Sequence, residues 1–150
     1  TATFRDLWEK PYANISEEKW AYFASLPILY STIVPKKEVM TMLNFLDKEG
    51  HTLYYITNRI DDLERVTRKY LDDYKFPQAS NLIHTDDKGM VVRTLEIDVI
   101  VEDKPKNLES LVGLCRTIGI SQIWNEDERV YLESLGVLFI PSAECVQEIL

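Results

Sequence analysis

The sequence predicts an α/β fold in three layers, with helices on both faces of a parallel sheet. Two observations predict it. From residue 51 onward, short apolar runs rich in aromatic and β-branched residues recur along the chain, and stretches with helical periodicity separate them. Apolar residues fill successive positions in several of the runs, as in strands that are covered on both faces, and such alternation is typical of right-handed parallel crossovers.

Five runs are the candidate strands, at residues 51–57, 81–85, 98–102, 121–124 and 137–140. Apolar residues spaced three and four apart predict helices between them. One such stripe covers residues 39–46 and ends before Gly50, a second covers residues 108–115 and ends before Gly119, and a looser one covers residues 63–70. Because glycine often follows the last turn of a helix, we expect helices to end near these two glycines.

The first 34 residues differ from the rest of the chain. They are rich in aromatic residues and contain two short helical patches but no convincing strand. Ser16 is a suitable N-cap for one of these helices. We therefore expect a small helical cap-like segment at 1–34 and an α/β core at 35–150.

Composition limits the classes of partner. The chain has 150 residues, 45% of them hydrophobic, which is enough for one sizeable core. A formal charge of −8 argues against a broad electrostatic grip on nucleic acid or on an anionic membrane. No apolar run is long enough to span a bilayer, and Cys115 and Cys145 are too few for a disulfide framework. We expect a cytoplasmic protein with a small-molecule partner.

Polar side chains follow three of the predicted strands. Thr57 and Asn58 follow the first, Lys88 comes soon after the second, and Glu102 and Asp103 end the third. The carboxyl ends of parallel strands are where functional groups gather. A hydroxyl and backbone amides hold phosphate oxygens, a lysine neutralises phosphoryl charge, and paired carboxylates bind Mg²⁺. Together these groups predict a metal-assisted phosphate site.

Each part also has a plainer interpretation. Thr57 and Asn58 would serve equally well as the cap of the next helix. Lys88, beside two acids and a glycine, fits a solvated turn. Glu102 and Asp103 fit the polar end of a strand before a helix. The order of the parts favours the site, because three separate strand ends supply the three components that one reaction needs.

Residues 35–141 resemble the haloacid dehalogenase-like hydrolase superfamily. YYITNR at 54–59 is similar to its second motif, Lys88 to its third, and VIVEDKPKN at 99–107 to its fourth. Within the superfamily the layout looks most like the 5′(3′)-deoxyribonucleotidase group. The resemblance implies a Rossmann-like core and a Mg²⁺-dependent phosphomonoester hydrolase whose substrate is a small phosphorylated molecule, with nucleoside monophosphates as one class.

The resemblance also implies a role for each residue. Thr57 would hydrogen-bond the substrate phosphate, and Asn58 would present a backbone amide beside it. Lys88 would hold the nucleophile and the phosphate charge together. Asp103 would bind Mg²⁺, and Glu102 would orient the water shell of the metal. The aromatic segment before residue 35 would form part of a pocket for the base.

One motif of the superfamily is missing from this sequence. Members carry a nucleophilic aspartate in a DxD motif at the end of the first strand, and no DxD occurs here. That strand would lie between the strands that end at Thr57 and Asp103, so its absence would leave unpaired backbone on both sides. We expect it to lie upstream of Thr1, because losing a buried central strand is costly; the alternative is a degenerate relative without a nucleophile.

Two other functions compete with the hydrolase. An inactive module with the same fold could bind a phosphorylated ligand or a protein partner. A response-regulator-like receiver also has an acid pair, a threonine and a lysine at strand ends. The order disfavours the receiver, because its lysine comes after the acids, whereas Lys88 precedes Glu102 and Asp103.

Overall fold

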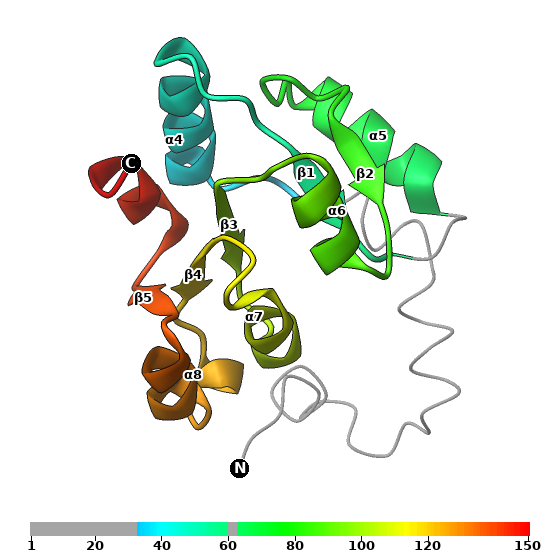
Figure 1. Cartoon of the computed structure of the whole chain (residues 1–150). Coiled ribbons are helices and arrows are strands. Elements are labelled where there is room, and N and C mark those ends of the chain that lie inside the picture. The colour runs from blue at the N-terminus through cyan, green and yellow to red at the C-terminus, as the bar shows by residue number, and fades with distance from the viewer. Residues whose placement is uncertain (1–32, 60–62) are drawn as a thin grey trace, which may run out of the picture. The chain divides into compact units, whose positions relative to one another are not determined.

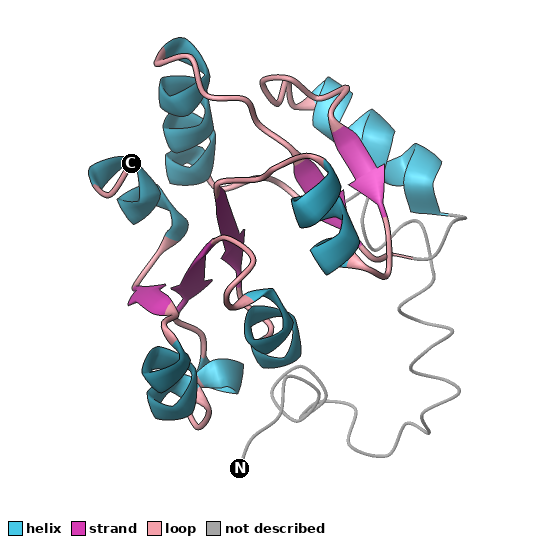
Figure 2. Ribbon diagram, in the orientation of Figure 1, coloured by secondary structure: helices cyan, strands magenta, loops and turns pink. Residues whose placement is uncertain are grey.

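A computed structural model of the chain describes residues 33–59 and 63–150. Along these residues helices and parallel strands alternate, so the predicted α/β class with Rossmann-like parallel strands is confirmed (Figures 1 and 2). The described chain groups into two compact units, one over residues 87–146 and the other over residues 33–86 together with 147–150. The predicted cap-like segment lies outside the described residues except for its last two, so the division at residue 34 stays a prediction.

The unit at 33–86 contains a parallel pair of strands. In chain order its elements are α4 (Lys37–Lys48), β1 (Tyr55–Thr57), α5 (Glu64–Asp73) and β2 (Leu82–His84). The predicted apolar stripe of α4 buries Met42 and Leu46. The helix also ends where expected: the backbone N–H of His51 donates to the carbonyl of Leu46, and Gly50 adopts a φ of 91°, which favours glycine.

The unit at 87–146 contains a sheet of three parallel strands in the order β3-β4-β5. Its elements are α6 (Lys88–Thr94), β3 (Val99–Glu102), α7 (Pro105–Leu111), β4 (Arg116–Ile120), the 3₁₀ helix η3 (Ile123–Asn125), α8 (Arg129–Leu135) and β5 (Leu138–Ile140). A further 3₁₀ helix, η4 (Ala143–Glu148), follows β5. None of the helices in the described ranges combines the length and the apolar character needed to cross a bilayer.

Two apolar clusters hold the β3-β4-β5 sheet to its helices. One joins Leu108 of α7 and Leu132 of α8 to Phe139 of β5, and the other joins Ile100 of β3 to Leu111 of α7. Both leucines of α7 are completely buried. Truncating such a side chain to alanine costs about 2–5 kcal/mol, so these contacts fix α7 firmly against the end of β3.

The fourth strand lies earlier in the chain than the sequence analysis predicted. It spans Arg116–Ile120, and the 3₁₀ helix η3 begins inside the predicted strand at 121–124. The prediction was wrong because Gly119 was interpreted as a helix end, whereas α7 already ends at Leu111. Gly119 is a strand residue beside an aromatic ring: a Cβ atom there would lie 2.7 Å from the ring of Phe139.

The described strands form two sheets, not one. Among the described residues, β1 pairs only with β2, and β3 pairs only with β4. Each of β1 and β3 therefore has one edge that pairs with no strand in the described ranges. The existence of a nucleophile-bearing strand upstream of Thr1 stays a prediction.

Candidate active site

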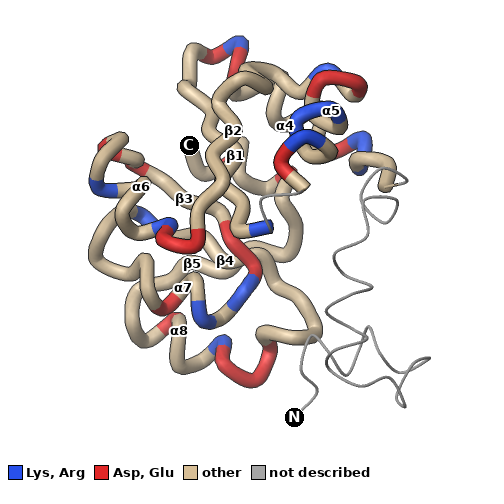
Figure 3. Tube along the Cα trace, turned by 90° about the vertical axis from the view of Figure 1, so that its right-hand side faces the viewer, with Lys and Arg blue, Asp and Glu red and all other residues tan. Residues whose placement is uncertain are grey.

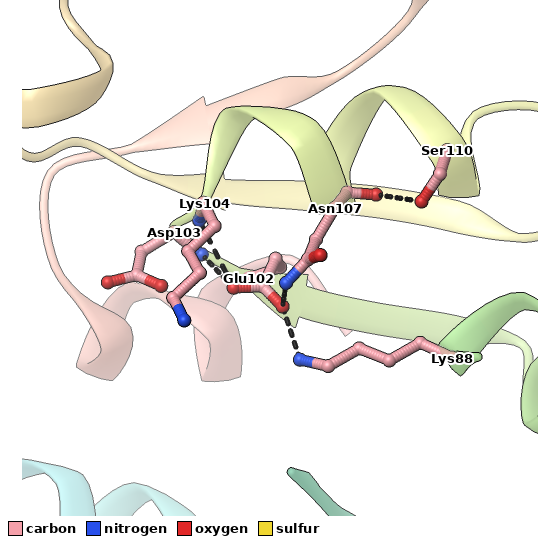
Figure 4. Close-up of polar contacts among 6 residues, drawn as sticks. All are labelled: Lys88, Glu102, Asp103, Lys104, Asn107 and Ser110. Carbon is pink, nitrogen blue, oxygen red and sulfur yellow. Dashed lines mark hydrogen bonds and ion pairs between the residues drawn. The ribbon is translucent and has the colours of Figure 1, made fainter. Parts of the chain in front are cut away.

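Glu102 is the centre of a dense polar cluster at the carboxyl end of β3 (Figure 4). Its side chain is only 6% exposed. Oε2 forms an ion pair with Nζ of Lys88 and accepts a hydrogen bond from Nδ2 of Asn107 at 2.9 Å. Oε1 accepts the backbone N–H groups of Asp103 and Lys104 at 2.9 and 3.1 Å. Both carboxylate oxygens are therefore fully used, and Glu102 is held in one orientation.

Two helix starts bring Lys88 and Asn107 to Glu102. Lys88 is the first residue of α6, whose N-cap Asp87 accepts the backbone N–H of Met90 through Oδ1 at 2.9 Å. Pro105 is the first residue of α7, a position where its missing N–H costs nothing, and this places Asn107 in the first turn. The Lys88 side chain is 17% exposed, so the structure replaces the solvated-turn interpretation with a largely buried ion pair.

The surroundings of the two adjacent acids shift their pKa values in opposite directions. Burial acts to raise the pKa of Glu102, but the hydrogen bond and the positive charge of Lys88 outweigh it and lower that pKa to about 2. Burial and the neighbouring Glu102 carboxylate raise the pKa of Asp103 to about 6. Between these two pKa values the pair therefore holds one proton, and that proton resides on Asp103; near neutral pH both carboxyl groups are largely ionised.

The side chain of Asp103 points in a different direction from that of Glu102. Figure 4 shows its carboxyl group pointing away from Lys88 and Asn107, and the side chain is half-buried. The trace changes from acidic to basic just after β3, and the positive charge of Lys104 opposes the rise in the pKa of Asp103 (Figure 3). A cation near Asp103 would favour the ionised form that burial and Glu102 disfavour.

The donor set fits a magnesium ion bound through Asp103. Within residues 33–59 and 63–150, no group of three His, Cys, Asp or Glu side chains is arranged to hold a metal. Mg²⁺ does not require one, because it keeps several waters and binds through one or two carboxylates together with substrate phosphate. The oxygens of Glu102 are already hydrogen-bonded, so Glu102 fits the role of an anchor and Asp103 that of a ligand.

Asn125 belongs to this cluster and was not identified from the sequence. It ends η3 and is completely buried. Its Nδ2 donates to the carbonyls of Asp103 and Ile120 at 2.8 and 2.9 Å, and its Oδ1 accepts the backbone N–H of Gln122 at 3.0 Å. The signal was an asparagine shortly after a strand end. It was overlooked because the strand was placed at 121–124.

Thr57 and Asn58 lie in the other unit. Thr57 ends β1 and is half-buried, its carbonyl accepts the backbone N–H of Thr85 at 2.9 Å, and Asn58 is exposed. Neither is the N-cap of α5, a position that Leu63 occupies. The structure thus brings Lys88, Glu102 and Asp103 together, while a shared role for Thr57 and Asn58 stays a prediction.

Two curated proteins are similar to part of the chain. A protein of Bacillus cereus named "Putative nucleotidase" is 29% identical over 90 residues, which cover 57% of this chain and 48% of that protein. A protein of Halalkalibacterium halodurans, also named "Putative nucleotidase", is 35% identical over 77 residues, covering 51% of this chain and 38% of that protein. The chain thus spans about half, or less, of the length of these relatives. No protein-family model and no solved structure matches the chain.

Proposed function

We propose that this chain serves in a Mg²⁺-dependent phosphomonoester hydrolase of the haloacid dehalogenase type, with nucleoside monophosphates as its substrate class. The observation that carries the proposal is the cluster of Lys88, Glu102 and Asp103 at the carboxyl end of β3. The nucleotidase names of both relatives support the same class of reaction.

Lys88 would stabilise the phosphoryl group during transfer. A lysine ammonium group has three donors, and Glu102 takes one of them. The others are available for a phosphate oxygen and for the nucleophile. Because the ion pair with Glu102 holds the ammonium group in place before the substrate arrives, little reorganisation is needed when charge develops.

Asp103 would hold the magnesium ion. The ion, when bound, offsets the repulsion between an anionic nucleophile and a phosphate dianion. Asp103 suits this position because its carboxyl group points away from the donors that saturate Glu102. Thr57 and the backbone amide of Asn58 would bind phosphate oxygens, and the nucleophile would come from a DxD motif that this sequence does not contain.

The test is phosphate release by the full-length natural protein from a panel of nucleoside and sugar monophosphates. We expect release that a chelator abolishes and Mg²⁺ restores. Asp103→Asn should reduce it on the order of 100-fold or more. Asp98→Asn is the matched control, because Asp98 is an exposed aspartate just before the same strand. Chelator-resistant release, or near-wild-type turnover by Asp103→Asn, would contradict the proposal.

A second candidate is an inactive module that binds a phosphorylated ligand or a protein partner. Such a module would use the same cluster around Lys88 and Glu102 to hold the anionic group. The same panel separates the two functions. Saturable binding of a monophosphate by the full-length protein, with no phosphate release in the presence of Mg²⁺, would identify the binding module.

A further inference from the structure

Asn125 fills a gap in backbone hydrogen bonding where β3 and β4 separate. The two strands pair in parallel up to Glu102 opposite Gly119, and the ladder stops there. The next carbonyls, those of Asp103 and Ile120, both accept a hydrogen bond from the single amide group of Asn125. A buried carbonyl left without a partner is destabilising, so this side chain keeps two strand ends together after their pairing has ended.

The carboxamide is also held from its own side. Its Oδ1 accepts the backbone N–H of Gln122 at 3.0 Å, and the backbone N–H of Asn125 donates to the carbonyl of Gln122 at 3.1 Å. Both N–H donors and the oxygen of this completely buried side chain therefore have partners. Asn125 is therefore a rigid anchor, unlike a surface asparagine that exchanges between partners.

The consequence falls on Asp103. Its N–H donates to Oε1 of Glu102 at 2.9 Å, and its carbonyl accepts Nδ2 of Asn125 at 2.8 Å. The peptide groups on both sides of its Cα atom are thus tied to buried side chains. Fixing both peptides fixes the direction of the Cα–Cβ bond, and with it the side of the strand end toward which the carboxyl group extends.

We propose that Asn125 is a positioning residue for Asp103, which it holds in the orientation that binds a divalent cation. The inference rests on the proposed function in one respect, that Asp103 is the metal ligand. Groups that orient a metal ligand without touching the metal typically contribute 10–100-fold to affinity, or about 1.4–2.7 kcal/mol. We expect a loss of that size when the two N–H donors of Asn125 are removed.

The experiment measures Mn²⁺ binding to the full-length protein without substrate, by the paramagnetic resonance signal of free Mn²⁺. Asn125→Asp keeps the shape and the acceptor for Gln122 but replaces both donors with an oxygen that repels two carbonyls. We expect the Kd for Mn²⁺ to rise 10–100-fold. Asn125→Ser removes the carboxamide without adding charge and tests the same point if the aspartate variant does not fold.

Val137→Ala is the control for lost stability. Val137 is buried in the apolar cluster of Leu108, Leu132 and Phe139. Its side chain takes no part in the hydrogen bonds that hold Asp103. It should lower the melting temperature while leaving the Kd for Mn²⁺ unchanged. A merely structural role for Asn125 would give the same result for the Asn125 variants, and that outcome would overturn the proposal.

Two further outcomes keep the inference separate from the proposed function. Mn²⁺ binding that Asp103→Asn does not weaken, or no binding by the wild type, would overturn the positioning role. Mn²⁺ binding that depends on both Asp103 and Asn125, with no phosphate release from any monophosphate, would support the positioning role and refute the hydrolase.

Discussion

The carboxyl ends of β3 and β1 both present polar residues, but the chain holds them in different ways. At β3, Glu102 accepts four hydrogen bonds, from Lys88, Asn107 and two backbone N–H groups. At β1, the carbonyl of Thr57 continues the pairing with the β2 strand, and Asn58 is exposed. The first end is organised before any ligand arrives. The second has groups that a ligand can still engage.

The two strand ends also differ in how completely their buried polar side chains are hydrogen-bonded. The buried polar side chains at the end of β3, Glu102 and Asn125, have hydrogen-bond partners for every oxygen and nitrogen. Opposite Thr57 in the β1–β2 register lies His84, whose two ring nitrogens are buried without a hydrogen-bond partner among the described residues. Preorganised charge is costly to assemble but needs no rearrangement during a reaction, which explains why the densest network surrounds the charged residues.

Replacing Lys88 at the end of β3 should have the largest effect on the stability of the fold. Lys88→Met leaves the buried Glu102 carboxylate without its counter-charge, and breaking such a pair costs about 3–5 kcal/mol. We expect the free energy of unfolding at pH 7 to fall by about 3 kcal/mol, since Lys88 is slightly exposed. Denaturant titration measures the change, and Lys106→Met, at an exposed lysine two residues beyond Lys104, is the control.

The dependence on pH gives this prediction its sharpest form. The pKa of Glu102 is about 2 in the folded chain, against an ordinary value of 4.5. Its stabilising contribution is therefore present above about pH 4.5 and is lost as the pH falls toward 2. The difference between wild type and Lys88→Met should shrink over that window. A difference that stays constant down to pH 2 would show that the ion pair does not stabilise the fold.

Asp103→Asn should stabilise the metal-free protein. The pKa of Asp103 is raised from 3.8 to about 6, so the folded state favours the protonated form and loses stability as the pH rises between these values. Asparagine removes that penalty. Because Asp103 is partly exposed, we expect a gain of about 1 kcal/mol at pH 7, well below the full value of the shift, and little gain at pH 4.

Thermal unfolding in the presence of a chelator measures the gain. Excess Mg²⁺ should reverse its sign, because only the wild type would bind the ion. Equal melting temperatures for wild type and Asp103→Asn at pH 7 without metal would mean that burial and Glu102 do not make the ionised form of Asp103 unfavourable.

Thr57→Val should have the smallest effect on stability. The Thr57 hydroxyl has no hydrogen-bond partner among the described residues, and valine has nearly the same shape, so the free energy of unfolding should change by less than about 0.5 kcal/mol. If the hydroxyl binds phosphate, KM for the best monophosphate should rise about 10-fold. Thr52→Val, at an exposed threonine before β1, is the control. Unchanged KM would remove Thr57 from the phosphate site.

Much of this arrangement could be predicted from the sequence. The strands that end at Thr57 and Glu102 and the helix that ends shortly before Gly50 all lie where periodicity and turn residues placed them. The position of β4 was predicted wrongly because a glycine can either follow a helix or leave room for a neighbouring side chain within a strand. Only the ring of Phe139, twenty positions later, shows that Gly119 is needed for close packing. The same error hid Asn125, since its importance depends on where β4 ends.

The sequence by itself determined which chemical groups follow each strand, because alternating apolar runs and local turn residues specify strand ends from neighbours a few positions away. It could not determine which acid of the pair is anchored and which remains available. That was decided by tertiary structure: the side-chain donors to Glu102 come from the starts of α6 and α7, and the anchor for Asp103 comes from beyond β4. Burial raises the pKa of Asp103, and the distant Lys88 lowers that of Glu102, so only the folded protein separates the two pKa values.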